Sequence, residues 1–273
     1  MNLLQKIKNR YRYSYILLRQ IVLTDFKLRY QNSVLGYLWS LLRPLFLFGV
    51  LYVLFVVILN TGGDVPHFGT YLLLGLVFWN FFVEATTGAV SLIVAKGDLL
   101  RKINFPRYII ILSNAISALI NLSLNLIVIF VFMWISGAEP NKYALFLPLL
   151  IFELFVFSLA ISFYLSAVFV KYRDIGFIWE VMTQMLFYVT PILYAFSFIS
   201  DKSETLAKVV MMNPLAQIIQ DARYGLITDK TTTAYQLFDG GWYALIPLII
   251  VVITAAIGMS FFRKQSKYFA ENV

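Results

Sequence analysis

The sequence contains no cysteine and a single histidine, His67, among its 273 residues. The lack of cysteine excludes a disulfide framework and any metal site with Cys ligands. A catalytic triad or zinc site built on histidine is not expected from one residue of that type. The chain also lacks GxxxxGK[ST], HExxH, GxSxG and GxGxxG motifs. We therefore expect this chain to be no enzyme, to hold no cofactor and to bind no ATP itself.

Charged residues are scarce, at 13% of the chain, whereas hydrophobic residues make up 60%. Soluble domains carry about 25% charged residues, so this chain has too little polar surface to face water on all sides. The first apolar run follows a charged stretch of about thirty residues, so a cleavable signal peptide is not expected. The composition predicts an integral membrane protein.

Long apolar stretches define the predicted architecture. A bilayer core about 30 Å thick requires ~20 apolar residues in a helix. Six stretches reach this length, at 34–59, 71–94, 108–135, 144–170, 177–199 and 242–262. They predict an all-α integral membrane fold in which residues 34–262 form a domain of six transmembrane helices, with an external region at 200–241 and a tail at 263–273.

Lysine and arginine collect on one side of these predicted helices. Residues 1–43, the second-to-third and fourth-to-fifth links and the tail hold seventeen of the twenty-two. Because cytoplasmic segments of membrane proteins are enriched in these residues, we expect both termini and both basic links in the cytoplasm. An even number of spans leads to the same orientation.

The N-terminal arm, residues 1–33, is predicted to be an amphipathic helix. Its apolar residues recur every three or four positions, at Leu4, Ile7, Tyr11, Tyr15, Leu18, Val22 and Phe26. Basic residues occupy much of the remaining surface, so the helix is expected to lie in the membrane plane near anionic headgroups. Docking of this basic helix on another protein is the alternative, and the two can coexist.

Four charged residues, Arg43, Glu84, Glu153 and Glu180, fall inside predicted spans, where each costs roughly 2.5–3.5 kcal/mol on insertion scales. Arg43 and Glu84 lie at a similar depth, roughly 14–15 Å from the cytoplasmic side at ~1.5 Å per residue. We predict that they pair or face one polar cavity, where Pro44 disrupts the helical bonds. The alternative is that Arg43 snorkels to a membrane edge near Leu42 and Glu84 stands alone.

Aromatic residues make up 17% of the chain, and some lie deep within predicted spans. Aromatic faces beside a water-filled path suit sugar rings, which places Trp79, Phe82, Phe187 and Tyr188 on a candidate translocation path. The alternative is that such residues form interfacial belts or lipid-facing packing.

The link AKGDLLRKINFPRY between the second and third spans predicts a short cytoplasmic helix. Gly97 and Asp98 resemble a turn with an N-cap, and Pro106 ends the segment. Leu99, Leu100 and Ile103 are expected to be exposed there and to dock on a partner. A second candidate contact is VKYRDIGF, in the fourth-to-fifth link. Solvated turns are the alternative for both.

The external region predicts two short helices that dip into the outer leaflet. The first covers residues 201–212, and the second begins with Asn213 as N-cap and Pro214 at the first helical position. Its apolar face holds Leu215, Ile218, Ile219 and Ala222, with Gly225 at its end. These helices act as a lid over an exit or simply pack against the outer ends of the spans.

Four ordered motifs resemble one family. They are FKLRYQNSVLGYLWSLLRPLF, LLRKINFPRYIIILSN, VFVKYRDIGFIWEVMTQMLFYVTPILY and NPLAQIIQDARYGL. Together, over essentially the whole chain, they resemble the ABC-2 polysaccharide and polyol-phosphate export permeases, the membrane subunits of O-antigen and teichoic-acid ABC transporters.

The resemblance implies a homodimer bound to two ATPase subunits that hold ATP and Mg²⁺, with no nucleic acid as partner. It implies an interfacial N-terminal helix, re-entrant gate helices and an aromatic-lined channel for a lipid-linked glycan. The ATPase-coupling residues would be Gly97, Asp98, Leu99, Leu100, Arg101, Lys102, Ile103, Tyr172, Arg173 and Asp174. The external gate residues would be Asn213, Pro214, Ile218, Arg223 and Tyr224.

Three alternatives are open from the residues. The same fold also exports small drugs or lipids. A membrane enzyme acting on polyprenyl phosphate would call for clustered acids or histidines at a membrane face, which the lone His67 does not support. An ion channel would not depend on a motor subunit.

Overall fold

The computed structural model describes residues 3–30, 36, 38–59, 65–102 and 105–269, and every regular element in these ranges is helical. The longest helices are α1 (Leu3–Tyr30), α2 (Leu38–Tyr52), α3 (Phe68–Val90), α6 (Tyr108–Ser136), α7 (Leu147–Lys171), α8 (Ile175–Val189) and α13 (Ile246–Gln265). The others are α4 (Leu92–Ala95), α5 (Gly97–Lys102), α9 (Ser197–Ser200), α10 (Glu204–Met211), α11 (Pro214–Leu226) and α12 (Ala234–Leu237). A π-helix, Val53–Ile58, continues α2, and 3-10 turns flank two helices at Lys142–Phe146, Trp242–Leu245 and Ser266–Tyr268.

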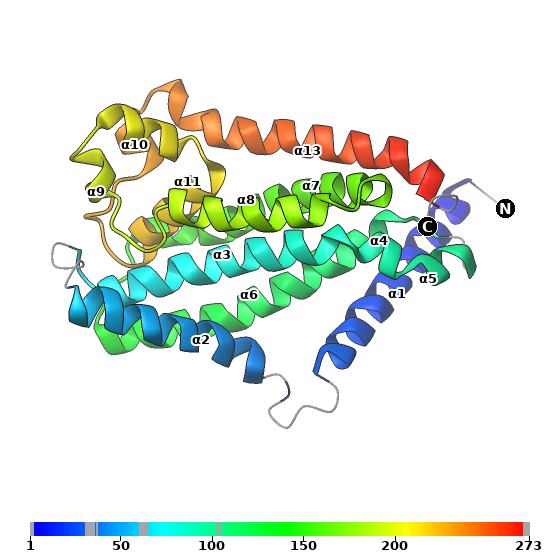
Figure 1. The fold of residues 1–273 in the computed structure, drawn as a ribbon, viewed down its shortest axis with the longest axis horizontal. Coiled ribbons are helices and arrows are strands. Elements are labelled where there is room, and N and C mark those ends of the chain that lie inside the picture. Colours follow the sequence, from blue (N-terminus) through cyan, green and yellow to red (C-terminus); the bar gives the residue numbers. More distant parts are fainter. Residues whose placement is uncertain (1–2, 31–35, 37, 60–64, 103–104, 270–273) are drawn as a thin grey trace.

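Five helical segments are long and apolar enough to cross a bilayer. They are Leu38–Ile58, Phe68–Val90, Tyr108–Ser136, Lys142–Lys171 and Trp242–Tyr268. Figure 1 shows them running side by side, with α1 crossing one end of the bundle and α9, α10 and α11 at the other. The predicted class, an all-helical multi-pass membrane protein, is confirmed.

The prediction of one helix over 177–199 is wrong. The helix α8 ends at Val189 after 15 residues, which at ~1.5 Å per residue is about 22 Å and too short for a bilayer core. Pro191 provides the reason, because proline has no N–H for the helix and disfavours helical backbone in the residue before it. Thr190 accordingly has an extended backbone, with φ −76° and ψ 132°.

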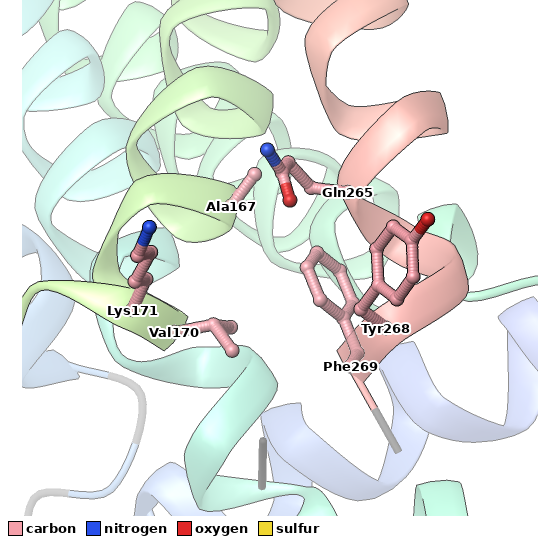
Figure 2. Close-up of a pocket in the computed structure, with 6 residues that line it drawn as sticks. All are labelled: Ala167, Val170, Lys171, Gln265, Tyr268 and Phe269. Carbon is pink, nitrogen blue, oxygen red and sulfur yellow. The ribbon is translucent and has the colours of Figure 1, made fainter. Parts of the chain in front are cut away.

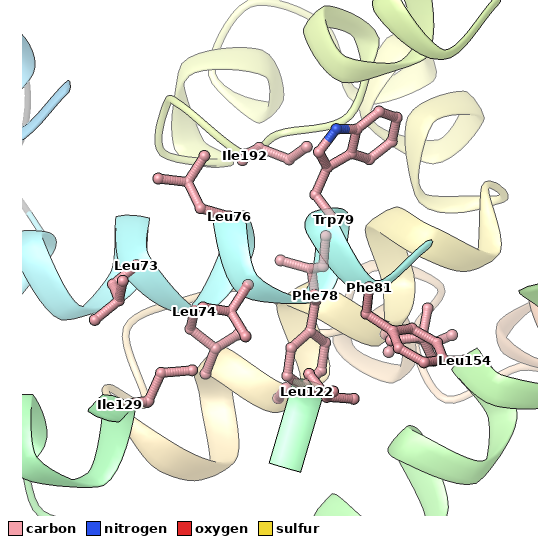
Figure 3. Packing of buried hydrophobic residues seen from close by; sticks show 14 of the residues in the cluster. Leu73, Leu74, Leu76, Phe78, Trp79, Phe81, Leu122, Ile129, Leu154 and Ile192 are labelled. Atoms are coloured by element: carbon pink, nitrogen blue, oxygen red, sulfur yellow. The ribbon is translucent and has the colours of Figure 1, made fainter. Parts of the chain in front are cut away.

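The core is built around α3. In its apolar window 78% of the residues are buried, compared with 11% in α2. Figure 3 shows Leu74 and Phe78 of α3 directed toward α6, and Phe81 directed toward Leu154 of α7. Because lipid is as apolar as these side chains, van der Waals packing holds the helices together here rather than exclusion from water. The central α3 is therefore the scaffold, and α2 lies at its periphery.

Helices α7 and α13 approach each other closely at one glycine. A Cβ on Gly258 would overlap the carbonyl oxygen of Ala160, and small residues at such points let membrane helices pack backbone to backbone. Nearer the C-terminus the same helices leave a hollow of about 250 Å³, lined by Ala167, Tyr268 and Phe269 among others (Figure 2). Gly258 thus permits a close backbone contact between α7 and α13.

We expect Gly258→Ala to lower the free energy of unfolding by about 1–2 kcal/mol, because the new methyl group must push two backbones apart. Unfolding in mixed detergent micelles, followed by circular dichroism, measures this change. Gly49→Ala in α2 is the matched control, since a Cβ there meets no atom within 4 Å. Equal stability of the two variants would contradict the assigned contact.

The described part of the predicted N-terminal arm, Leu3–Tyr30, is one helix, α1, and part of it is docked on the chain's own bundle. Ile21 is 8% exposed and packs with Ile93, Phe105 and Ile109 in a second hydrophobic cluster. Figure 1 shows that α4, α5 and the last turns of α13 lie at the same end of the molecule. Most of the basic segments of the sequence therefore meet at one end of the bundle.

Candidate functional site

The first candidate site is the elbow formed by α4 and α5. Asp98 in the first turn of α5 and the basic residues Arg101 and Lys102 in its last turn complement the helix dipole. All three are exposed. The prediction that Leu99 and Leu100 are also exposed is wrong, because both are half-buried against the cluster around Ile93. Any partner that meets this elbow therefore meets mainly its charged side chains.

The link between α7 and α8 is the second exposed segment at this end. Tyr172, Arg173 and Asp174 are all exposed. The Arg173 guanidinium lies over the Phe169 ring, 5.2 Å from its centroid, and Lys171 lies 5.1 Å from that of Tyr172. Helix α4 packs against α7. The two segments that the sequence predicted to contact a partner, the α4–α5 elbow and the α7–α8 link, therefore lie at the same end of the molecule.

The opposite end is organised by a buried arginine in α11. Arg223 is fully buried, and its guanidinium donates hydrogen bonds to three backbone carbonyls. Nε lies 3.0 Å from the oxygen of Tyr71, Nη1 lies 2.6 Å from that of Pro191, and Nη2 lies 2.9 Å from that of Ile192. The last two carbonyls follow the break after α8, where no helical N–H reaches them. Arg223 therefore stabilises the break and ties α11 to α3.

The surroundings of Arg223 suit a permanent cation. Its guanidinium stacks 3.5 Å from the centroid of the Tyr71 ring, a cation–π contact that is stronger when desolvated. Burial lowers the pKa of Arg223 to about 10, so the side chain remains charged at neutral pH. Gly75 leaves the space, because a Cβ there would overlap the guanidinium.

Further polar contacts fix α11 to its neighbours. The Tyr71 hydroxyl lies 3.2 Å from Gln220 Oε1, which also accepts a hydrogen bond from Thr231 at 3.0 Å. Asp221 accepts from Gln217 Nε2 at 2.7 Å and from the Ala234 N–H at 3.3 Å. Burial raises the pKa of Asp221. These bonds join α11 to α3 and to the loop before α13.

The comparison with known protein families shows which family this chain belongs to. The family described as ABC-2 type transporter matches residues 16–227, from the middle of α1 to just past α11. The chain belongs to the ABC-2 type transporter family. The resemblance predicted from the four motifs is thereby confirmed, and it includes both ends of the bundle described above.

Individual relatives match this ABC-2 transporter over nearly its whole length. The O-antigen export system permease protein RfbA of Klebsiella pneumoniae is 30% identical over 97% of this chain and 98% of its own. A protein of the same name from Myxococcus xanthus is 27% identical over 99% of this chain and its full length. The capsule polysaccharide export inner-membrane protein CtrC of Neisseria meningitidis serogroup A is 22% identical, with 92% and 90% covered.

Within one copy of the ABC-2 transporter, Arg43 and Glu84 do not form an ion pair among the contacts of the described residues. Arg43 is exposed on α2. Glu84 is half-buried, and its Oε1 accepts a hydrogen bond from Asn121 Nδ2 of α6 at 2.7 Å. A carboxylate inside the bundle can be stabilised by an amide donor as well as by a cation.

The predicted path residues separate into buried and exposed groups. Trp79 and Phe82 are 6% and 1% exposed, and their ring centroids are 5.6 Å apart. Phe187 packs on Trp79 at 5.5 Å, so the structure brings these three together inside the bundle. Tyr188, by contrast, is 68% exposed. Of the four, Tyr188 alone offers most of its ring to a neighbour outside the chain.

The predicted gate residues lie on α11 and just before it. Asn213 is the N-cap, its side chain accepting from the Leu215 N–H, and Pro214 begins the helix as predicted. Gly225 does not end the helix. A Cβ there would lie 3.0 Å from the backbone of Tyr143 and Ala144, so this glycine permits close packing on the turn before α7.

The structure describes the other predicted gate residues, Ile218 and Tyr224, but not the predicted coupling residue Ile103. Ile218 is fully buried, and the Tyr224 ring packs in a tilted arrangement on that of Tyr143, with 5.3 Å between the ring centroids. Sequence reasoning missed the partners of Arg223, which are Tyr71 and the carbonyls of Pro191 and Ile192. The available signal was an arginine within an apolar helix face, which requires buried acceptors.

Proposed function

We propose that this chain is the membrane subunit of an ABC transporter that exports a polysaccharide across the bacterial cytoplasmic membrane. The observation that carries the proposal is the similarity, over 97% or more of the chain, to two permeases named for O-antigen export. The cargo is a lipid-linked glycan or a teichoic-acid-like polymer. A separate ATPase subunit binds ATP and Mg²⁺ and drives the transport.

Two ATPase subunits dock at the end of the bundle that holds α5 and the α7–α8 link, in a complex with two copies of this chain. The exposed charges of Asp98, Arg101 and Lys102, next to those of Arg173 and Asp174, support this assignment. A charged surface of this kind gives specificity and orientation to a partner rather than bulk affinity.

The polymer passes between the two copies. The support is the large apolar surface that α2 and α8 leave outside the bundle. In α8 it comprises Phe177, Ile178, Val181, Met185 and Tyr188, all more than half exposed. Two such faces, one from each copy, enclose a path that is separated from the lipid. Its walls include aromatic rings, which suit the C–H faces of sugars.

The docking end faces the cytoplasm, and with it both termini. The excess of lysine and arginine in the segments at this end supports this orientation. The chain after α8 completes a sixth crossing, with α9, α10 and α11 as an external gate that dips into the outer leaflet. The exposed side of α1, with Tyr15, Ile16 and Arg19, lies at the inner membrane surface.

The test of this function is export in cells. Deletion of the gene should abolish surface polysaccharide, and a plasmid copy should restore it in a strain that retains the ATPase gene but not in a strain that lacks it. Purification of the tagged chain should recover the ATPase. Normal surface polysaccharide in the deletion strain, with loss of resistance to a small drug instead, would assign the small-substrate alternative.

We expect Lys102→Glu to lower ATPase association and ATP-driven export roughly tenfold, because the substitution reverses a charge in the proposed contact. Co-purification and export assays measure the two effects. Lys264→Glu, an exposed lysine on α13 at the same end, is the matched control and should change neither. If both variants behave like the wild type, the ATPase docks elsewhere.

A further inference from the structure

Lys96 is the joint between α4 and α5. Its N–H donates to the Leu92 carbonyl at 3.0 Å, and its own carbonyl accepts from the Leu100 N–H at 3.1 Å. The main chain of Lys96 therefore takes part in the hydrogen bonding of both short helices. The orientation of α5 depends on how this one residue is held.

The side chain of Lys96 is held by α1. Its Nζ lies 2.9 Å from Oδ1 and 2.6 Å from Oδ2 of Asp25, a residue 71 positions earlier. The side chains are 20% and 31% exposed, so water and salt screen the pair less than a fully exposed one. Of the ion pairs formed between described residues, the other, Glu204–Lys208, lies within α10. Of these two pairs between described residues, Asp25–Lys96 connects separate helices.

The two helices that the pair connects, α5 and α1, differ in how firmly other contacts hold them. With six residues, α5 is too short to be stable as an isolated helix, so its position must come from outside contacts. In α1, by contrast, Ile21 and Val22 are each 8% exposed, and Ile21 belongs to the cluster that includes the start of α6. Asp25 lies one turn beyond Ile21 and provides a fixed anchor for the elbow.

We infer that the Asp25–Lys96 pair is a positioning link that fixes the angle of α5 to α1 and α6. This inference rests on the function proposed above: a force applied to α5 by the ATPase passes through the link into α1 and α6 instead of tilting α5 alone. Neither side chain is assigned any contact with ATP or polymer. The pair acts entirely through the position of α5.

The first test removes the Asp25–Lys96 ion pair without removing any proposed contact with ATP or polymer. Asp25→Asn and Lys96→Gln should each lower the amount of polymer exported per ATP hydrolysed roughly three- to tenfold, while membrane insertion and ATPase association remain. The double exchange Asp25→Lys with Lys96→Asp should restore most of the ratio, because it rebuilds the ion pair with reversed signs. Lys264→Gln is the control for loss of a basic residue at this end.

The second test uses the absence of cysteine from the chain. The double variant Asp25→Cys, Lys96→Cys should have the low ratio when reduced. A short reversible thiol–thiol crosslinker should then raise the ratio, and reductant should lower it again, because a covalent link replaces the ion pair. The two single-cysteine variants, treated in the same way, should not respond.

The outcomes distinguish the link from the transport function. A wild-type complex that exports polymer, together with an Asp25→Asn variant of unchanged ratio, overturns the link and leaves the proposed function intact. Crosslinking that arrests export also overturns it, because the elbow and α1 would then have to separate. A wild-type chain that exports no polymer with its ATPase overturns the proposed function, and the link with it.

Discussion

Arg223→Met is expected to lower the free energy of unfolding by about 3–5 kcal/mol, the range for breaking one side of a buried charged contact. Methionine fills a similar volume but donates no hydrogen bond, so the carbonyls of Pro191 and Ile192 lose their partner in the described contacts. Each buried polar group left unpaired costs about 1–3 kcal/mol. The chain after α8 should then separate from α11, which unfolding in mixed detergent micelles would detect.

Two control variants test why Arg223→Met lowers the free energy of unfolding. Arg223→Lys keeps the charge but cannot direct three donors as a planar guanidinium does, so most of the loss should persist. Arg263→Met removes an exposed arginine from the last turn of α13 and should cost only a few tenths of a kcal/mol. If Arg223→Lys matched the wild type, charge rather than the three-carbonyl geometry would be the stabilising factor.

Phe82→Ala is expected to lower the free energy of unfolding by about 2–3 kcal/mol. Phe82 is 1% exposed and packs between Phe157, at 5.9 Å between ring centroids, and Trp179, at 6.1 Å. In water, truncation of a buried phenylalanine costs about 3–5 kcal/mol. Here the transfer contribution is smaller, because the unfolded reference state is also surrounded by lipid, and the cavity dominates.

Tyr188→Ala is the matched aromatic truncation on the outer face of α8. With 68% of Tyr188 exposed, stability should change little, whereas export by the intact transporter should fall if the ring lines the proposed path. The free energy of unfolding and the rate of export should both be measured for Phe82→Ala and for Tyr188→Ala. A stable Phe82→Ala protein that fails to export polymer would return Phe82 to the path and contradict its place in the core.

Much of the fold was predictable because helix ends are encoded locally. The N-cap Asn213 followed by Pro214 predicted the start of α11, and the predicted third span, 108–135, agrees within one residue with α6, which Gly137 follows with φ 71°. The break after α8 was less predictable. Pro191 was visible in the sequence, but the length of the break depends on Arg223, which lies 32 positions later and supplies the donors that replace the helical hydrogen bonds.

The candidate site was predictable as segments and much less as individual contacts. The sequence indicated the two basic links, and in the structure Asp98, Arg101 and Lys102 of one and Tyr172, Arg173 and Asp174 of the other are exposed at one end of the bundle. The half-buried state of Leu99 and Leu100 was not predictable, because it depends on α1 and α6 lying beneath α5. Likewise, charge pairing could not predict the hydrogen bond that Glu84 accepts from the side-chain amide of Asn121.

The sequence by itself determined the membrane class, most of the spans, the basic side and the family. These properties follow from segment length, charge distribution and ordered motifs, each of which is read along the chain. Only the tertiary structure decided which faces pack: that Trp79 and Phe82 belong to the core, and that Arg223 ties α11 to α3. In water, a polar stripe marks the exposed side of a helix. In lipid, both the core and the surroundings are apolar, so the pattern of residues carries little information about which side is buried.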